Sequence, residues 1–122
     1  MTTNILSPFF KGIFFVMILI TAFSSCSKKC KDENPRARIN NQGTDKADVQ
    51  IKTSGGNTEN INNIYTGQVS PWVSYAPGQL EFTINVSGST DTVVLVTMSS
   101  CWEYDINIDT ADRVYTTPVK RD

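Results

Sequence analysis

A row of acidic and amide side chains near the C-terminus is the first place where residue types and spacing suggest chemistry. The row alternates with apolar residues and consists of Glu103, Asp105, Asn107 and Asp109. Its D-x-N-x-D spacing matches the opening of an EF-hand calcium loop, but Thr110 stands where that loop needs glycine and Thr116 where it needs glutamate. A strand also spreads alternate residues ~6.6–6.8 Å apart, which is too far for neighbouring pairs to chelate one ion unaided. We therefore expect a solvated sheet face here and no metal site.

Two aromatic residues in the stretch SPWVSYAPG form a second candidate site. Trp72 and Tyr75 lie between two prolines and follow an asparagine-rich segment, 57–63. Exposed aromatic rings beside amides are suited to stacking on sugars, so this pair is a candidate glycan- or small-ligand-binding site. The alternative is that Trp72 covers one end of the core, which is the commoner position for a large aromatic side chain.

The absence of histidine limits the chemistry available to this chain. None of the 122 residues is histidine, so neither a Ser-His nor a Cys-His nucleophile can be assembled. A glycosidase-like mechanism needs two carboxylates about 5–9.5 Å apart, and the sequence singles out no such pair. The formal net charge is −1, and the only basic run is Lys28, Lys29 and Lys31, which argues against nucleic acid as a partner. We expect a protein without catalytic activity and without a cofactor.

The N-terminus has the layout of a secretory signal peptide. Lys11 precedes an unbroken apolar run, 13–20, and two serines lead directly to Cys26. The apolar run is far shorter than the about 20 residues that a transmembrane helix needs, and an uncleaved N-terminal anchor is the alternative. The segment FSSC resembles the lipobox of bacterial lipoproteins, with Phe23 at a position where leucine is commoner in that family.

This resemblance implies where the protein resides. A lipobox cysteine becomes the acylated first residue of the mature protein, so Cys26 would carry palmitate-type chains after removal of the signal peptide, residues 1–25. Two or three acyl chains anchor a protein stably, whereas a single chain gives only marginal membrane binding. The resemblance thus implies a lipid anchor in the cell envelope, on the periplasmic or surface face of the outer membrane. Besides the membrane, a glycan or an envelope protein is the expected partner, and the expected role is structural or adhesive.

The remaining two cysteines lie far apart in the sequence. If Cys26 is acylated, Cys30 and Cys101 remain in an oxidising compartment, where disulfides persist. A bridge between them would close a loop of about 70 residues and contribute about 4 kcal/mol in the chain-entropy model. The alternative is that Cys101 is a buried free thiol, because cysteine is among the residues most often buried.

Two short motifs suggest covalent modification. The tripeptides DTV and DTA place Thr92 and Thr110 second, and both resemble a three-residue O-glycosylation sequon used on exported proteins by some Gram-negative bacteria. Both lie beside predicted turns, where a transferase could reach them. Chance occurrence is the alternative, since three-residue patterns arise easily.

The elements that position these residues are predicted to be short strands. After residue 26 no window shows the apolar stripe of a helix, and alternation between turn-forming clusters is typical of strands. The expected strands are 36–40, 48–53, 69–75, 80–86, 93–98, 102–108 and 114–117, with 58–63 as a loop or weak strand. Residues 93–98 are apolar on both faces, which predicts a central strand covered on both sides.

The strand count and spacing predict an all-β domain. We expect a polar tether, 26–36, followed by a small immunoglobulin-like β-sandwich, 37–122, with a compact barrel as the alternative. Cys101 and Trp102 are adjacent and must point to opposite faces of a strand, which departs from the immunoglobulin arrangement of a core disulfide beside a tryptophan. The overall pattern resembles small uncharacterised β-sandwich lipoproteins of the bacterial envelope.

Overall fold

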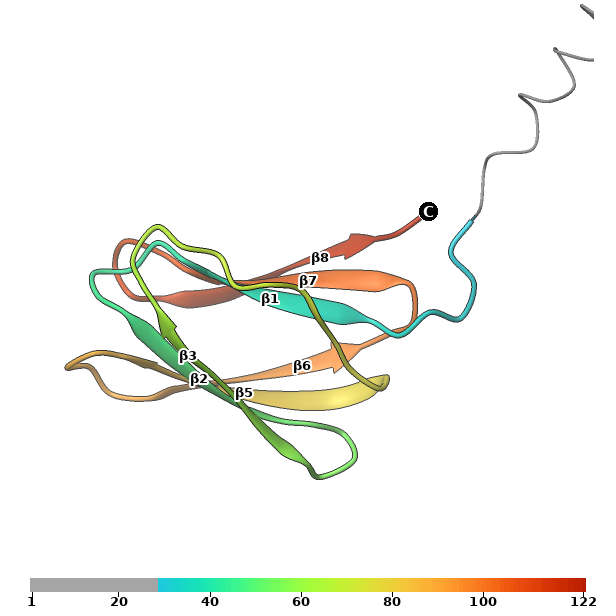
Figure 1. Ribbon diagram of the computed structural model, residues 1–122, viewed down its shortest axis with the longest axis horizontal. Coiled ribbons are helices and arrows are strands. Elements are labelled where there is room, and N and C mark those ends of the chain that lie inside the picture. Colours follow the sequence, from blue (N-terminus) through green and yellow to red (C-terminus); the bar gives the residue numbers. More distant parts are fainter. Residues whose placement is uncertain (1–28) are drawn as a thin grey trace, which may run out of the picture.

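A computed structural model of the chain describes residues 29–122 (Figure 1). The predicted signal peptide and the predicted lipidation site, Cys26, lie outside the described residues. Within residues 29–122 no helix has the length and apolar character needed to cross a membrane.

Eight strands make up the described part of the chain, in agreement with the predicted all-β class. They are β1 (Arg36–Asn41), β2 (Ala47–Lys52), β3 (Thr58–Ile64), β4 (Val73–Ser74), β5 (Gly78–Val86), β6 (Thr92–Met98), β7 (Trp102–Ile108) and β8 (Val114–Lys120). Four of them form one sheet in the order β4-β1-β7-β8, and the other four form a second sheet in the order β3-β2-β5-β6. The two sheets pack face to face as a β-sandwich, as Figure 1 shows.

The first sheet owes its shape to a pairing of distant strands. β1 and β7 run parallel, so that Arg36 pairs with Glu103 and Asn41 with Ile108, while β7 and β8 form an antiparallel hairpin. In the second sheet all three neighbouring pairs are antiparallel. A parallel pair needs a long connection between its strands, and here the whole second sheet is part of that connection.

The core follows from strict alternation along the strands. β5 shows the pattern best, because Leu80, Phe82, Ile84 and Val86 are buried and the residues between them are not. Tyr104, Ile106 and Ile108 of β7 face them from the other sheet. Every second side chain along these strands thus points into the space between the two sheets, as the alternation in the sequence predicts.

Two sequence-based predictions about strands are wrong. Residues 93–98 belong to β6, which lies at the edge of its sheet, and the side chains of Val93 and Leu95 are 56% and 58% exposed. The prediction of a central strand failed because apolar residues on both faces do not show whether the outer face is covered. The predicted strand 69–75 is reduced to β4 and a single bridge between Val69 and Asn40.

The segment before β1 is attached to the domain. A disulfide joins Cys30 to Cys101 in the turn between β6 and β7, with the two Cα atoms 5.7 Å apart. The Cys101 amide donates to the Glu33 carbonyl at 2.9 Å, and the Tyr75 amide donates to the carbonyl of the buried Pro35 at 3.0 Å. Within the predicted tether 26–36, the part from residue 30 onward is therefore fastened to the sandwich.

Candidate functional site

The outer face of the β4-β1-β7-β8 sheet carries a ladder of charged and amide side chains, which we call the arginine ladder. It is built by two strand segments of matching composition, RARIN in β1 and EYDIN in β7. The parallel register places Arg36 beside Glu103, Arg38 beside Asp105 and Asn40 beside Asn107. Because the intervening residues of both strands point into the core, these six side chains share the outer face.

Each rung of the arginine ladder is closed by a side-chain contact. Arg36 binds the Glu103 carboxylate, with its Nε 2.9 Å from Oε1. Arg38 Nε donates to Asp105 Oδ1 at 2.6 Å. The third rung is neutral, with Asn40 Nδ2 donating to Asn107 Oδ1 at 3.1 Å. The acidic row that resembled a calcium loop is thus engaged by arginines, and its face is half-buried where a solvated face was predicted.

Metal binding needs several ligand side chains close together, and the described residues 29–122 do not bring them together in this way. No group of three or more histidine, cysteine or acidic side chains there is arranged to hold a metal ion. Asp109, the last residue of the row, turns away from the ladder. Its carboxylate accepts hydrogen bonds from the amides of Ala111 and Arg113, both at 2.9 Å, and from Arg113 Nε at 3.0 Å. The hydrogen bond from the backbone amide of Arg113 is the main reason why the pKa of Asp109 is lowered.

Trp72 packs on the arginine ladder. The guanidinium carbon of Arg38 lies 4.3 Å from the centre of the indole ring, and that of Arg36 lies 5.0 Å away. Both distances are within the range of cation–π attraction. The indole therefore covers the charged outer face of the sheet, and it does not cover the end of the core as the alternative interpretation had it.

The prediction that Tyr75 joins Trp72 in a ligand-binding surface is wrong. Tyr75 is only 4% exposed and is part of the core between the sheets. Burial raises the pKa of the Tyr75 phenol to about 12, and the negative charge of Glu59 adds to the effect. A ring in this position cannot stack on a sugar at the surface.

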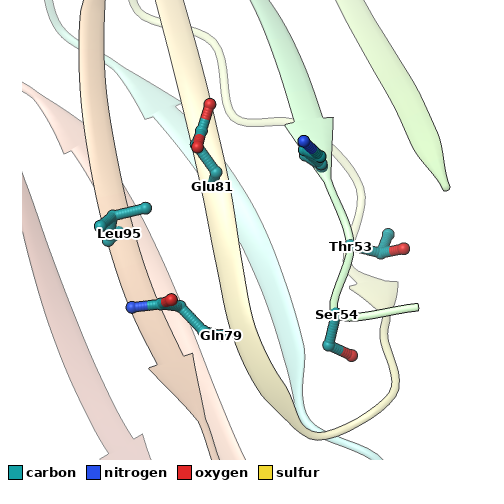
Figure 2. A pocket seen from close by; sticks show the side chains of 6 residues that line it. Thr53, Ser54, Gln79, Glu81 and Leu95 are labelled. Atoms are coloured by element: carbon teal, nitrogen blue, oxygen red, sulfur yellow. The ribbon is translucent and has the colours of Figure 1, made fainter. Parts of the chain in front are cut away.

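Two shallow depressions hollow the outer face of the β3-β2-β5-β6 sheet. One, of about 210 Å³, lies between β2, β5 and β6 and is lined by Lys52, Thr53, Ser54, Gln79, Glu81 and Leu95. Figure 2 shows that the labelled side chains point in different directions and do not converge on one point. The other, of about 180 Å³, is lined mainly by amides and carboxyls: Asp48, Val49, Gln50, Asn60, Asn62, Thr83, Asn85 and Asp91. Open polar surfaces of this kind differ from the enclosed apolar pockets typical of small-molecule sites.

The two candidate glycosylation sites lie in different settings. Thr110 is exposed in the turn between β7 and β8. Thr92 is half-buried and is already the first residue of β6, paired with Ile84. The Asp91 carboxylate beside it accepts a hydrogen bond from Asn85 Nδ2 at 2.7 Å. Of the two threonines, Thr110 is the more accessible to a transferase.

The sequence analysis missed the partners of the acidic row. Arg36 and Arg38 lie in the expected strand 36–40, which was given no role, although their spacing of two residues equals that of Glu103 and Asp105. Two complementary segments with the same period are a signal of strand pairing, and reading them together would have predicted the ladder. It would not have predicted Trp72, since the loop before β4 follows no regular pattern.

Known proteins give no further guidance to the site. No protein-family model matches the chain, and no curated protein matches it at a significant level.

Proposed function

We propose that this chain is a lipid-anchored protein of the bacterial cell envelope with a non-catalytic, structural or adhesive role. The observation that carries the proposal is the N-terminal sequence, in which a short apolar run ends in FSSC and Cys26 takes the position of a lipobox cysteine. The anchor would hold the β-sandwich at the membrane, on the periplasmic or surface side.

The disulfide supports an envelope location. Disulfides persist in oxidising compartments such as the periplasm and the cell surface, and are rare in the bacterial cytosol. The Cys30–Cys101 bond uses two cysteines and leaves Cys26 as the third cysteine of the sequence. A free cysteine directly after a signal-like leader is what lipidation requires.

The chemistry of the site supports a role without catalysis. The chain lacks histidine, and the carboxylates of Glu103 and Asp105 are each engaged by an arginine. A general acid or nucleophile needs a group that is free to exchange a proton or attack a substrate. The ladder is better suited to stiffening a flat protein surface.

Metabolic labelling tests the proposal. Cells that express the full chain are grown with labelled palmitate, with and without globomycin, an inhibitor of the lipoprotein signal peptidase. We expect label on the wild-type protein, accumulation of an uncleaved form with globomycin, and no label on Cys26→Ser. Cys30→Ser is the matched control and should still be labelled. Palmitate label that persists on Cys26→Ser, or a wild-type protein that carries no label, would contradict the proposal.

The second candidate function is a glycan- or small-ligand-binding surface module. The observation that favours it is the amide-lined depression on the β3-β2-β5-β6 sheet, where Gln50, Asn60 and Asn62 offer paired donors and acceptors. A glycan array with the folded domain tests this function. Binding that is lost in the Gln50→Ala/Asn60→Ala variant and kept in Gln42→Ala, in the turn after β1, would favour it over a purely structural role.

A further inference from the structure

The N-terminal segment is held to one end of the sandwich by several independent contacts. Besides the disulfide and the bond from the Cys101 amide to Glu33, Arg121 binds this segment from the C-terminal side. Its Nη1 lies 3.0 Å from Glu33 Oε2, and its Nη2 donates to the Asn34 carbonyl at 2.8 Å. The first fixed point of the domain is therefore Cys30.

The distance from Cys26 to Cys30 is only four residues. An extended chain spans at most 3.3–3.6 Å per residue, so roughly 14 Å separate the proposed lipid-bearing residue from the first fixed point. By comparison, the nine-residue strand β5 alone extends for about 30 Å. The connecting segment from Cys26 to Cys30, which we call the leash, is thus much shorter than the domain. The domain therefore cannot turn freely above a membrane.

The strand register shows which parts of the molecule lie at the leashed end, which we call the Cys101 end. It contains the β6–β7 turn with Cys101, the β2–β3 hairpin after Lys52, and the end of β8 at Lys120, which pairs with Trp102. The opposite end, which we call the far end, is formed by the turns 42–46, 87–91 and 109–113. Figure 1 shows these turns on the side opposite to the point where residue 29 joins the domain.

The two ends of the sandwich also differ in their balance of charged side chains. At the Cys101 end, the exposed bases Lys29, Lys31 and Lys120 are balanced by the exposed acids Asp32, Glu33 and Asp122. The far end carries Asp45, Asp91, Asp109 and Asp112, against Lys46 and Arg113. Anionic lipid headgroups attract lysines near a membrane surface and repel carboxylates. Electrostatics therefore favours the orientation that the short leash imposes.

We propose that the sandwich stands on the lipid surface with its Cys101 end against the headgroups and its far end directed away from the membrane. This inference rests on the proposed lipid anchor at Cys26 and adds the surface that meets the lipid. The far-end turns are then the part of the domain that a glycan or another envelope protein can reach. The far end also includes Thr110, the accessible candidate for glycosylation.

Energy transfer from tryptophan to a dansyl-labelled lipid tests the orientation. The lipidated full chain is reconstituted into vesicles of phosphatidylethanolamine and phosphatidylglycerol that contain the dansyl lipid. The Trp72→Phe variant retains a single donor, Trp102, at the Cys101 end. The variant Trp72→Phe/Trp102→Phe/Ala111→Trp has its single donor at the far end. We expect transfer several times higher from the first variant than from the second.

A longer leash provides the matched control. A flexible Gly/Ser insertion of 12 residues after Ser27 leaves every described contact in place and should lower the transfer from Trp102 and reduce the difference between the two donors. Equal transfer from both ends, or a difference that the insertion leaves unchanged, would overturn the proposal. Co-flotation with the vesicles is measured on the same samples. A chain that does not float would refute the lipid anchor itself, and this outcome is distinct from a chain that floats without a preferred orientation.

Discussion

Asn41 is the buried polar residue on which the turns of the far end depend. Its side chain is fully buried, and its Nδ2 donates to the carbonyls of Asp45 at 2.9 Å and Ile64 at 2.7 Å. Its Oδ1 accepts a hydrogen bond from the Gly43 amide at 2.8 Å. A Cβ atom on Gly43 would lie 2.9 Å from that same oxygen, so the tight turn needs glycine there. One side chain thus connects the ends of β1, β2 and β3.

We expect Asn41→Ala to lower the free energy of unfolding by about 2–4 kcal/mol, because three backbone groups, in two buried hydrogen bonds and one part-buried one, lose their partner. Urea denaturation followed by tryptophan fluorescence measures the change. Asn60→Ala, at an exposed position of β3, is the control and should stay within about 0.5 kcal/mol of wild type. Equal stabilities of the two variants would contradict this role of Asn41.

The buried phenol of Tyr75 predicts a loss of stability at alkaline pH. Its pKa is raised to about 12 in the folded protein, whereas an unfolded tyrosine has a pKa near 10. Between these values the folded state binds more protons than the unfolded state, so the free energy of unfolding falls as the pH rises. The stabilising contribution is complete below pH ~10 and is lost as the pH passes through the folded-state value.

A comparison of wild type with Tyr75→Phe checks this prediction. The difference between their ultraviolet titrations should show one phenol that ionises near pH 12, and the variant should lose stability less steeply between pH 10 and 12. A phenol that titrates near pH 10 in the folded protein would show that Tyr75 is accessible to solvent.

At the residue scale, the sequence shows where apolar side chains alternate, but outside the regular strands it does not show which side chains are buried. The alternation of residues 80–86 and 102–108 gave the core correctly, because a side-chain period of two has only one buried face. Tyr75 and Trp72 were misjudged because both lie in a loop region with little regular structure, where no period fixes which side is covered. The burial of Asn41 was also unpredictable, since a cluster such as Asn41-Gln42-Gly43 is typical of an exposed turn.

Among the strands, β6 is the one whose outer edge is least protected. It has seven residues, TVVLVTM, without a charge or a proline. The other edge strands are each protected, because β4 has only two residues, β8 contains Pro118 and β3 contains Glu59. The Ser99 amide just after β6 donates to Tyr104 Oη at 3.0 Å, so the Tyr104 side chain covers only the last part of this edge.

We expect Leu95→Lys to reduce aggregation during heating, because a charge on an edge strand opposes the addition of a further strand. Leu95 is 58% exposed, so the replacement removes little core packing. Light scattering during a thermal ramp measures the effect. Val69→Lys, at another exposed apolar side chain but outside β6, is the control. A similar decrease in scattering for both variants would show that net charge, and not the β6 edge, governs aggregation.

At the scale of the strands, sequence patterns predicted where most strands lie in the chain, but they did not predict which strands are neighbours in a sheet. Six predicted strands agree with β1, β2, β5, β6, β7 and β8 to within a few residues. Strand order could not be derived, because the pairing of β1 with β7 depends on segments 67 residues apart. The apolar residues of β6 misled because apolar side chains on both faces do not show whether the outer face is covered, and Val93 and Leu95 are exposed.

For the whole molecule, the disulfide is the bond that ties its beginning to its last third. It joins positions 71 residues apart, and closing a loop of that size restricts the unfolded chain by about 4 kcal/mol in the entropy model. We expect the Cys30→Ala/Cys101→Ala double variant to lose stability of that order, with a smaller denaturant midpoint and the same fold.

Urea unfolding of the double variant, and of wild type with and without a reductant, measures this loss. Reduced wild type should behave like the double variant, because both lack the cross-link. A double variant as stable as the oxidised protein would mean that the contacts of Glu33, Pro35 and Arg121 hold the segment without the bond.

The parallel pairing of β1 with β7 has a consequence for how the protein is made. The first strand leaves the ribosome long before its neighbour exists. Until Glu103 to Ile108 emerge, β1 has only the short strand β4 to pair with, so the four-strand sheet can close only at the end of synthesis. For the exported chain that we propose, such an order is an advantage, because its first half cannot complete the native structure alone.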